Sequence, residues 1–219
     1  MNKKLWFTIL AMMLTTIAFA QSETDFRVTL TDDNRGAIIT GYSGRTAEVN
    51  IPATIRGVPV REIANGAFAR NLVITSVVIP EGVTRIGDPL APGEYLGAFY
   101  SAPNLRSVTI PEGITVINAE TFYKCISLTT VILPSTLRII GSKAFSECIA
   151  LVTIDLPASI EVIGPSAFAG CGALVNVNIP DSVGKLRITS HLNPSFRGAS
   201  RVSVASQSAL RLRGYKGRF

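Results

Sequence analysis

The strongest constraint on the fold is a segment that returns every 23 residues. The chain reads TFYKCISLTTVILP from Thr121, AFSECIALVTIDLP from Ala144 and AFAGCGALVNVNIP from Ala167. A phenylalanine, a cysteine, a leucine and a proline stand at the same offsets in each copy. A unit of this length cannot bury its own apolar side chains, whereas stacked units cover one another. The repeat therefore predicts a solenoid.

Less regular copies extend the repeat in both directions. The proline that closes each copy stands at Pro52, Pro80, Pro111, Pro134, Pro157 and Pro180. The first two intervals are 28 and 31 residues, and the last three are 23. We interpret the longer intervals as local insertions. The largest of these lies between Gly87 and Ala98 and contains Glu94 and Tyr95.

Each copy contains one short stretch in which apolar and other residues alternate, as in Val131–Leu133. A period of two predicts a strand with one buried face, and the proline that follows ends the strand. Parallel strands of successive copies would pair at about 4.8 Å, so six rungs would make a stack roughly 30 Å long. The expected fold class is a mainly β repeat solenoid, right-handed and leucine-rich-repeat-like, with little helix in each unit.

The cysteines are explained by the same stacking. The position three residues after each phenylalanine holds a small or weakly polar side chain, namely Asn71, Ala102, Cys125, Cys148, Cys171 and Ala199. In a tight turn, a thiol can donate to a backbone carbonyl. Alternatively, two cysteines of adjacent rungs lie close enough to form a disulfide in an oxidising compartment. The sequence leaves both possibilities open.

The first 20 residues are predicted to be a secretory signal peptide of the bacterial type. Lys3 and Lys4 precede an apolar run from Leu5 to Ile17, and Ala18-Phe19-Ala20 supplies a small-residue cleavage pattern. The alternative, a transmembrane anchor, is disfavoured because the apolar run is short for a bilayer core of about 30 Å. We expect an exported protein, periplasmic or on the outer surface, with no transmembrane anchor.

The remaining chain divides into a cap, repeats and a second cap. Residues 21–50 are expected to form an N-terminal cap hairpin and the first strand, with a turn at Asp33–Gly36. Residues 51–200 are expected to form the leucine-rich repeats. Residues 201–219 are expected to form a basic C-terminal cap with a short helix within Ser208–Gly214, ended by the glycine.

The motif AFxxCxxLxxVxIPxxxxxIG, written between residues 98 and 180, resembles the BspA-like leucine-rich repeat, also called the treponemal class. The resemblance covers about residues 26–219. It implies an exported or surface protein, because members of this family are typically found there. Some members are linked to adhesion to host matrix proteins and to cell–cell aggregation, so the resemblance also implies a protein-binding role.

The residues offer no set for catalysis or for a cofactor. His191 is the single histidine, the carboxylates are scattered, and neither GxxxxGK[ST] nor GxGxxG is present. The cysteines lack CxxC spacing, which disfavours a metal site. We expect no enzyme activity and no cofactor. Because the protein is expected to be exported, we also expect no nucleic-acid partner.

Three surfaces are candidates for binding. The outward strand positions make a shallow polar face, in which we select Ser107, Thr109, Thr130, Ile132, Thr153, Asp155, Asn176 and Asn178. The insertion contributes a candidate loop at Glu94 and Tyr95. The C-terminal end contributes a candidate polyanion patch of Arg201, Arg211, Arg213, Lys216 and Arg218.

The charge of the chain is concentrated at one end. The whole chain has a formal net charge of +6. Residues 21–180 carry eleven Lys and Arg against fourteen Asp and Glu, whereas residues 181–219 carry eight against one. The basic end is consistent with attraction of acidic proteins, sulfated glycans or anionic lipid. A soluble cap with basic residues at its helix end is the other interpretation.

The preferred functional hypothesis is a non-enzymatic, exported protein–protein interaction module, whose solenoid face contacts a host matrix or envelope protein. The alternative hypothesis is a periplasmic scaffold protein that assembles with copies of itself, as a homo-oligomer. Exposed apolar residues on the strand face, such as Ile132, are what motivate this alternative.

Overall fold

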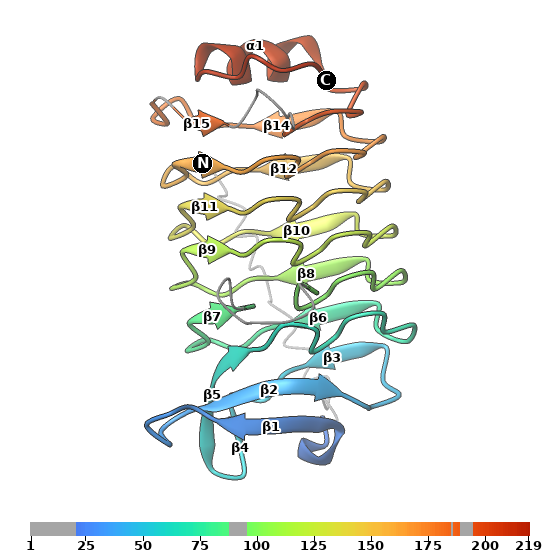
Figure 1. Cartoon of the computed structure of the whole chain (residues 1–219), viewed down its shortest axis with the longest axis vertical. Coiled ribbons are helices and arrows are strands. Elements are labelled where there is room, and N and C mark those ends of the chain that lie inside the picture. Colours follow the sequence, from blue (N-terminus) through green and yellow to red (C-terminus); the bar gives the residue numbers. More distant parts are fainter. Residues whose placement is uncertain (1–20, 88–95, 185, 189–194) are drawn as a thin grey trace, which may run out of the picture.

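The computed structural model describes residues 21–87, 96–184, 186–188 and 195–219. The chain winds into a stack of about six rungs with strands on two opposite faces (Figure 1), which confirms the expected repeat solenoid. The first face is formed by β3 (Glu48–Asn50), β6 (Ser76–Val78), β8 (Ser107–Thr109), β10 (Thr130–Ile132), β12 (Thr153–Asp155) and β14 (Asn176–Asn178). The second face is formed by β5 (Val58–Ile63), β7 (Arg85–Ile86), β9 (Val116–Ile117), β11 (Ile139–Ile140), β13 (Val162–Ile163) and β15 (Arg187–Ile188).

A column of phenylalanines forms the centre of the core. Six of them stack on one another, namely Phe68, Phe99, Phe122, Phe145, Phe168 and Phe196. Neighbouring ring centroids lie 5.0 to 5.4 Å apart, with interplanar angles of 12° or less. Tyr42 continues the column at one end and Tyr215 at the other. Because the repeat puts one ring at the same place in every rung, burial of each ring depends on the rungs beside it.

The three cysteines form a second buried column, and all are free thiols. The Sγ atoms of Cys125, Cys148 and Cys171 donate to the carbonyl oxygens of Phe99, Phe122 and Phe145 at 3.2, 3.1 and 3.1 Å. Of the two possibilities that the sequence left open, the structure therefore shows the hydrogen-bonded thiol. Each thiol bridges its rung to the preceding one.

The first face is divided by a seam between β10 and β12. Parallel pairing joins β3, β6, β8 and β10 into one block, and β12 and β14 into another. Within the described residues, no backbone pairing joins β10 to β12. On the second face, β11 and β13 pair across the same boundary, within a sheet that runs from β9 to β15. In the described residues the pairing of the second face is interrupted elsewhere, between β7 and β9. Val131 beside the seam is only half-buried, whereas its equivalents Val108 and Ile154 are buried.

The N-terminal cap is the expected hairpin. β1 (Phe26–Leu30) pairs antiparallel with β2 (Ala37–Tyr42), and β2 pairs parallel with β5. A short 3₁₀ helix at Glu23–Asp25 comes before β1. A second, smaller hairpin joins β4 (Thr54–Ile55) to β5. Its turn consists of Arg56 and Gly57, with φ of 52° and 76°. Positive φ at both positions suits a two-residue hairpin loop, so this short insertion forms a tight turn.

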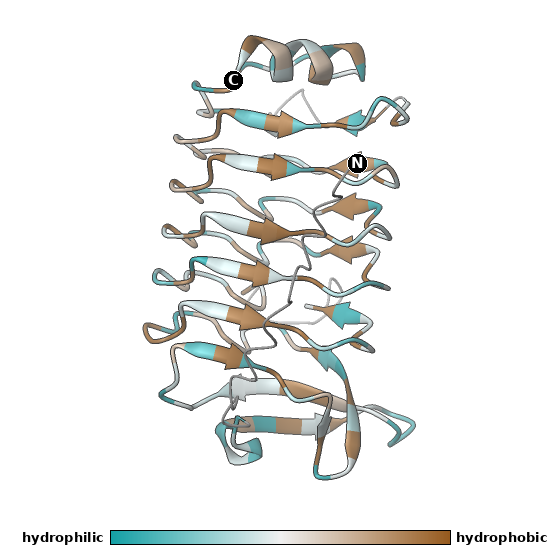
Figure 2. Ribbon diagram, turned by 180° about the vertical axis from the view of Figure 1, so that it is seen from behind, coloured by the Kyte–Doolittle hydropathy of each residue, from teal (hydrophilic) through white to brown (hydrophobic). Residues whose placement is uncertain are grey.

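The C-terminal cap is the helix α1 (Val204–Leu212), which lies across the last rung in the views from both sides (Figure 1 and Figure 2). It begins four residues before the expected Ser208, because Ser203 caps it by accepting a hydrogen bond from the Ser206 amide at 3.3 Å. It ends at Leu212, and Gly214 follows with a φ of 109°. Tyr215 then packs edge-on against Phe196, so the cap closes the phenylalanine column.

Candidate protein-binding surfaces

The eight candidate residues of the strand face all lie on the first face, where pairing brings them together in register. Ser107 lies beside Thr130 and Thr109 beside Ile132 in one block. In the other block, Thr153 lies beside Asn176 and Asp155 beside Asn178. Thr130, Ile132, Asp155 and Asn178 are exposed and the other four are half-buried. The seam between β10 and β12 separates the two blocks, so backbone pairing aligns the candidates within each block and not across the seam.

A hollow of about 370 Å³ lies on this face at the C-terminal ends of β6, β8 and β10. We call it the notch. Val78 and Ile132 are 47% and 55% exposed on either side of it, and Thr109 is in register between them. Glu81 and Glu112, each three residues beyond an outward strand position, also line it, and we call this pair its acidic edge. The notch therefore combines apolar side chains with two acidic ones.

The Glu112 carboxylate is held in place by the next rung. It accepts hydrogen bonds from the Ser135 backbone amide at 2.8 Å and from the Ser135 hydroxyl at 2.9 Å. The Ser135 backbone amide and hydroxyl lower the pKa of Glu112 below its ordinary value. The carboxylate thus keeps its charge and its position.

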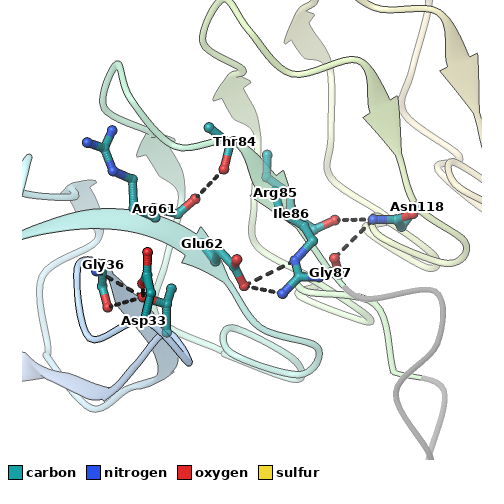
Figure 3. A network of polar contacts seen from close by, with 10 residues as sticks. Asp33, Gly36, Arg61, Glu62, Thr84, Arg85, Ile86, Gly87 and Asn118 are labelled. Atoms are coloured by element: carbon teal, nitrogen blue, oxygen red, sulfur yellow. Dashed lines mark hydrogen bonds and ion pairs between the residues drawn. The ribbon is translucent and has the colours of Figure 1, made fainter.

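A second, polar hollow of about 590 Å³ lies where the hairpin turn meets the second face. Figure 3 shows the contacts that organise it. Arg85 donates to Glu62 from Nε at 3.1 Å and from Nη2 at 2.5 Å. Asp33 accepts hydrogen bonds from the Thr31 hydroxyl and the Arg35 amide, which lower its pKa. Gly36 lets the hairpin turn lie close to the Arg61 side chain, because a Cβ at this position would lie 2.6 Å from Cγ of Arg61.

This polar hollow is lined by acidic and basic side chains in equal number. Its carboxylates are Asp32, Asp33 and Glu62, and its guanidinium groups are Arg35, Arg61 and Arg85. The sequence analysis did not identify it, because it combines two repeat strands with the hairpin turn of the cap, which lies outside the repeat. The available signal was the spacing of 23 residues between Glu62 and Arg85, which is one rung.

The five basic residues of the C-terminal cap divide into two kinds. Arg201, Arg211, Lys216 and Arg218 are exposed. Arg213 instead points inward, and its side chain is 12% exposed. Its guanidinium donates to the carbonyl oxygens of Pro180, Val183 and Ala209 at 3.1 to 3.2 Å. Arg213 thus fastens the cap to the last rung, and four cations remain accessible to a partner.

The candidate loop residues Glu94 and Tyr95 lie outside the described residues, as does the expected signal peptide. The structure does describe the point where this insertion leaves the solenoid. There, the buried Asn118 side chain donates to the carbonyl oxygens of Ile86 and Gly87 at 2.9 and 3.0 Å.

In the described part of the chain, no helix is both long and apolar enough to cross a membrane.

The described residues contain no cluster of three or more His, Cys, Asp or Glu suited to a metal ion. Burial raises the pKa of Cys125 and Cys171 to about 12, and raises that of Cys148 well above its ordinary value. The thiols are therefore protonated at neutral pH, and reactive cysteines require the thiolate. They lie in the core, and none of them lines the notch or the polar hollow.

Comparison with known proteins identifies the repeat. The model of the BspA type leucine-rich repeat region matches residues 45–90 and 95–196, in six copies. The chain belongs to the BspA-type leucine-rich-repeat family. Leucine-rich-repeat proteins are generally protein-interaction modules. No curated protein matches the chain.

Two solved structures support the family assignment. A leucine-rich repeat protein of T. pallidum is 30% identical with a TM-score of 0.70, and the match covers 91% of this chain and 98% of that one. A leucine-rich repeat protein of Bacteroides ovatus is 28% identical with a TM-score of 0.67. That match covers 81% of this chain but only 44% of the other protein. The BspA-type chain described here thus spans less than half of the B. ovatus protein.

Proposed function

We propose that this BspA-type protein is an exported, non-enzymatic module that binds another protein through the first face of its solenoid. The observation that carries the proposal is the register of the eight candidate residues, which places small polar side chains side by side along that face. Contact with a partner would be broad and shallow, spread over several rungs. The partner is a host matrix protein or a protein of the cell envelope.

The character of the first face supports a protein partner over a small molecule. Its side chains at Ser107, Thr130, Thr153 and Asn176 are short, and backbone pairing holds each of them against a neighbour. A rigid surface of this kind loses little conformational entropy when it binds. Small ligands prefer enclosed, mainly apolar pockets. The notch on this face is open by comparison.

Binding to immobilised host matrix proteins tests the proposal. The variant Thr130→Lys/Thr153→Lys/Asn176→Lys introduces three large side chains on the first face and is expected to lose affinity at least about tenfold. The matched control carries three lysines at exposed positions elsewhere, Thr115→Lys/Ala158→Lys/Ser182→Lys. Equal affinity of the two folded variants would rule out the first face as the binding surface.

Export is tested on intact source cells with added protease. We expect the protein to be cleaved while a periplasmic control protein survives, if it reaches the outer surface. Protection until the envelope is opened would place it in the periplasm, and the partner would then be an envelope protein. Retention in the cytoplasm would contradict the proposal.

A further inference from the structure

The outer side of α1 carries exposed apolar side chains on an otherwise basic cap. Val204 and Leu212 are 79% and 85% exposed, more than any other large apolar residue in the described part of the chain. Arg211 is exposed and precedes Leu212 at the C-terminal end of the helix, whereas Arg201 is exposed before its N-terminal end. Residues 195–219 contain no acidic residue at all. The C-terminal end of the helix therefore offers an apolar side chain with a cation next to it.

The notch offers the complementary surface. Between Val78 and Ile132, the short side chain of Thr109 leaves room for an incoming apolar group. Glu81 and Glu112 at its edge can form ion pairs with a cation of a bound partner, and the hydrogen bonds from Ser135 fix the position of the Glu112 carboxylate. Opposite charges at the edge of an apolar contact steer association and fix its orientation.

We propose that the notch binds the α1 cap of a second copy of this chain, with Leu212 between Val78 and Ile132 and with Arg211 at the acidic edge. The inference rests on the proposed function, since it uses the first face as a protein-binding surface, and it adds the identity of one partner. Charge complementarity selects this occupant over an anionic lipid surface, because the acidic edge of the notch repels anionic lipid while the chain itself supplies the basic partner.

The contact joins two different surfaces, so it is heterologous. A copy that inserts its cap into a neighbour keeps its own notch open, and the neighbour keeps its own cap exposed. Such a contact continues from copy to copy unless the geometry closes a ring. We therefore expect oligomers that grow with concentration. Because the charges lie at the surface, salt weakens the contact.

Sedimentation velocity of the purified exported chain, over a wide range of concentration at low salt, measures this association. We expect the mean mass to rise with concentration and to fall when salt is added. Glu81→Arg and Arg211→Glu should each weaken self-association about tenfold or more, because each places like charges together. Leu212→Asn should weaken it as well. Arg187→Glu reverses an exposed charge on the second face and serves as the control with no effect.

An equimolar mixture of Glu81→Arg and Arg211→Glu provides the decisive measurement. In the mixture, each variant meets a copy of opposite charge, so association should return to the wild-type level. A folding defect in either variant could not produce such rescue. A wild-type chain that stays monomeric at every concentration overturns the inference, and so does association that neither variant weakens.

Two further outcomes separate this inference from the proposed function. A monomeric chain that binds vesicles of anionic lipid, and loses this binding on Leu212→Asn, would make the cap a lipid-binding surface and overturn the inference. A monomeric chain that binds matrix proteins, with loss of affinity in the triple lysine variant of the first face, would overturn the inference and leave the proposed function standing.

Discussion

At the scale of single residues, the cysteine column shows how a polar atom is accommodated in the core. Each thiol donates to a carbonyl of the preceding rung, and burial raises its pKa. We expect no reaction of the native protein with a thiol reagent at pH 8, and reaction of all three cysteines after unfolding. Fast labelling of the native protein would contradict this, and fewer than three thiols after unfolding without reductant would indicate a disulfide.

The raised thiol pKa also predicts an alkaline weakness. In the unfolded chain the thiols release protons near the ordinary value of 9.0, whereas Cys125 and Cys171 in the folded chain hold them to about 12. The unfolded state therefore binds fewer protons above pH 9, and the free energy of unfolding falls as pH rises from 9 toward 12. Cys171→Ala should flatten this dependence, as measured by denaturant melts at pH 7 and pH 10. Alanine suits the position, because Ala102 and Ala199 occupy it in other rungs.

Asn118 tests what a buried side-chain amide contributes beside the insertion. Its side chain donates to two carbonyl oxygens and is 9% exposed. Asn118→Ala removes the side-chain donor from both carbonyl oxygens, so we expect a loss of about 2 kcal/mol in the free energy of unfolding. Asn104→Ala is the matched control, because that exposed amide donates only to the Leu72 carbonyl. A similar loss in both variants would show that burial is not what makes Asn118 important.

At the scale of elements, the seam predicts uneven protection of the first face. The Asn176 amide donates to the Val152 carbonyl at 3.1 Å, whereas the equivalent amide of Thr153 faces the seam, with no pairing between β10 and β12. We expect faster hydrogen exchange at the Thr153 amide than at the Asn176 amide, measured by NMR. Slower or equal exchange at Thr153 would show that β10 and β12 pair in solution. Because the second face pairs across the same boundary, the seam should open without separating the rungs.

The sequence predicts the one strand per repeat that an alternating pattern marks, and it misses the second strand. The positions of β3, β6, β8, β10, β12 and β14 and the stacked phenylalanines follow from the periodic pattern. The second-face strands β7, β9, β11, β13 and β15 do not, because two residues are too few to show an alternation. The seam does not follow, because its two strands carry the same pattern as their paired equivalents. The polar hollow is also not predicted, because Asp33 of the hairpin turn lies beside β5 and β7 only once in the fold, and a repeat pattern does not indicate such an arrangement. In the cap, composition alone gave Arg213 the same role as Arg211, and only the fold turns its guanidinium inward.

At the scale of the whole molecule, the strand pairing of the described residues joins each rung to its neighbours, so stability should spread along the stack one rung at a time. In such solenoids each repeat is stabilised by the interfaces with its neighbours, and the terminal caps protect the ends. A defect at one end is therefore expected to loosen the nearest rungs first. The far end should respond only when the whole chain unfolds.

Arg213→Ala makes this expectation testable at the C-terminal end. It removes the hydrogen bonds from one guanidinium to three carbonyl oxygens, which should cost about 2 kcal/mol. We expect hydrogen exchange measured by mass spectrometry to accelerate in β14 and α1, with β2 and β5 unchanged. Arg201→Ala, which removes an exposed arginine from the same cap, should leave both ends protected. Uniform acceleration along the chain in Arg213→Ala would instead mean that the rungs unfold as one cooperative unit, and that the cap stabilises every rung equally.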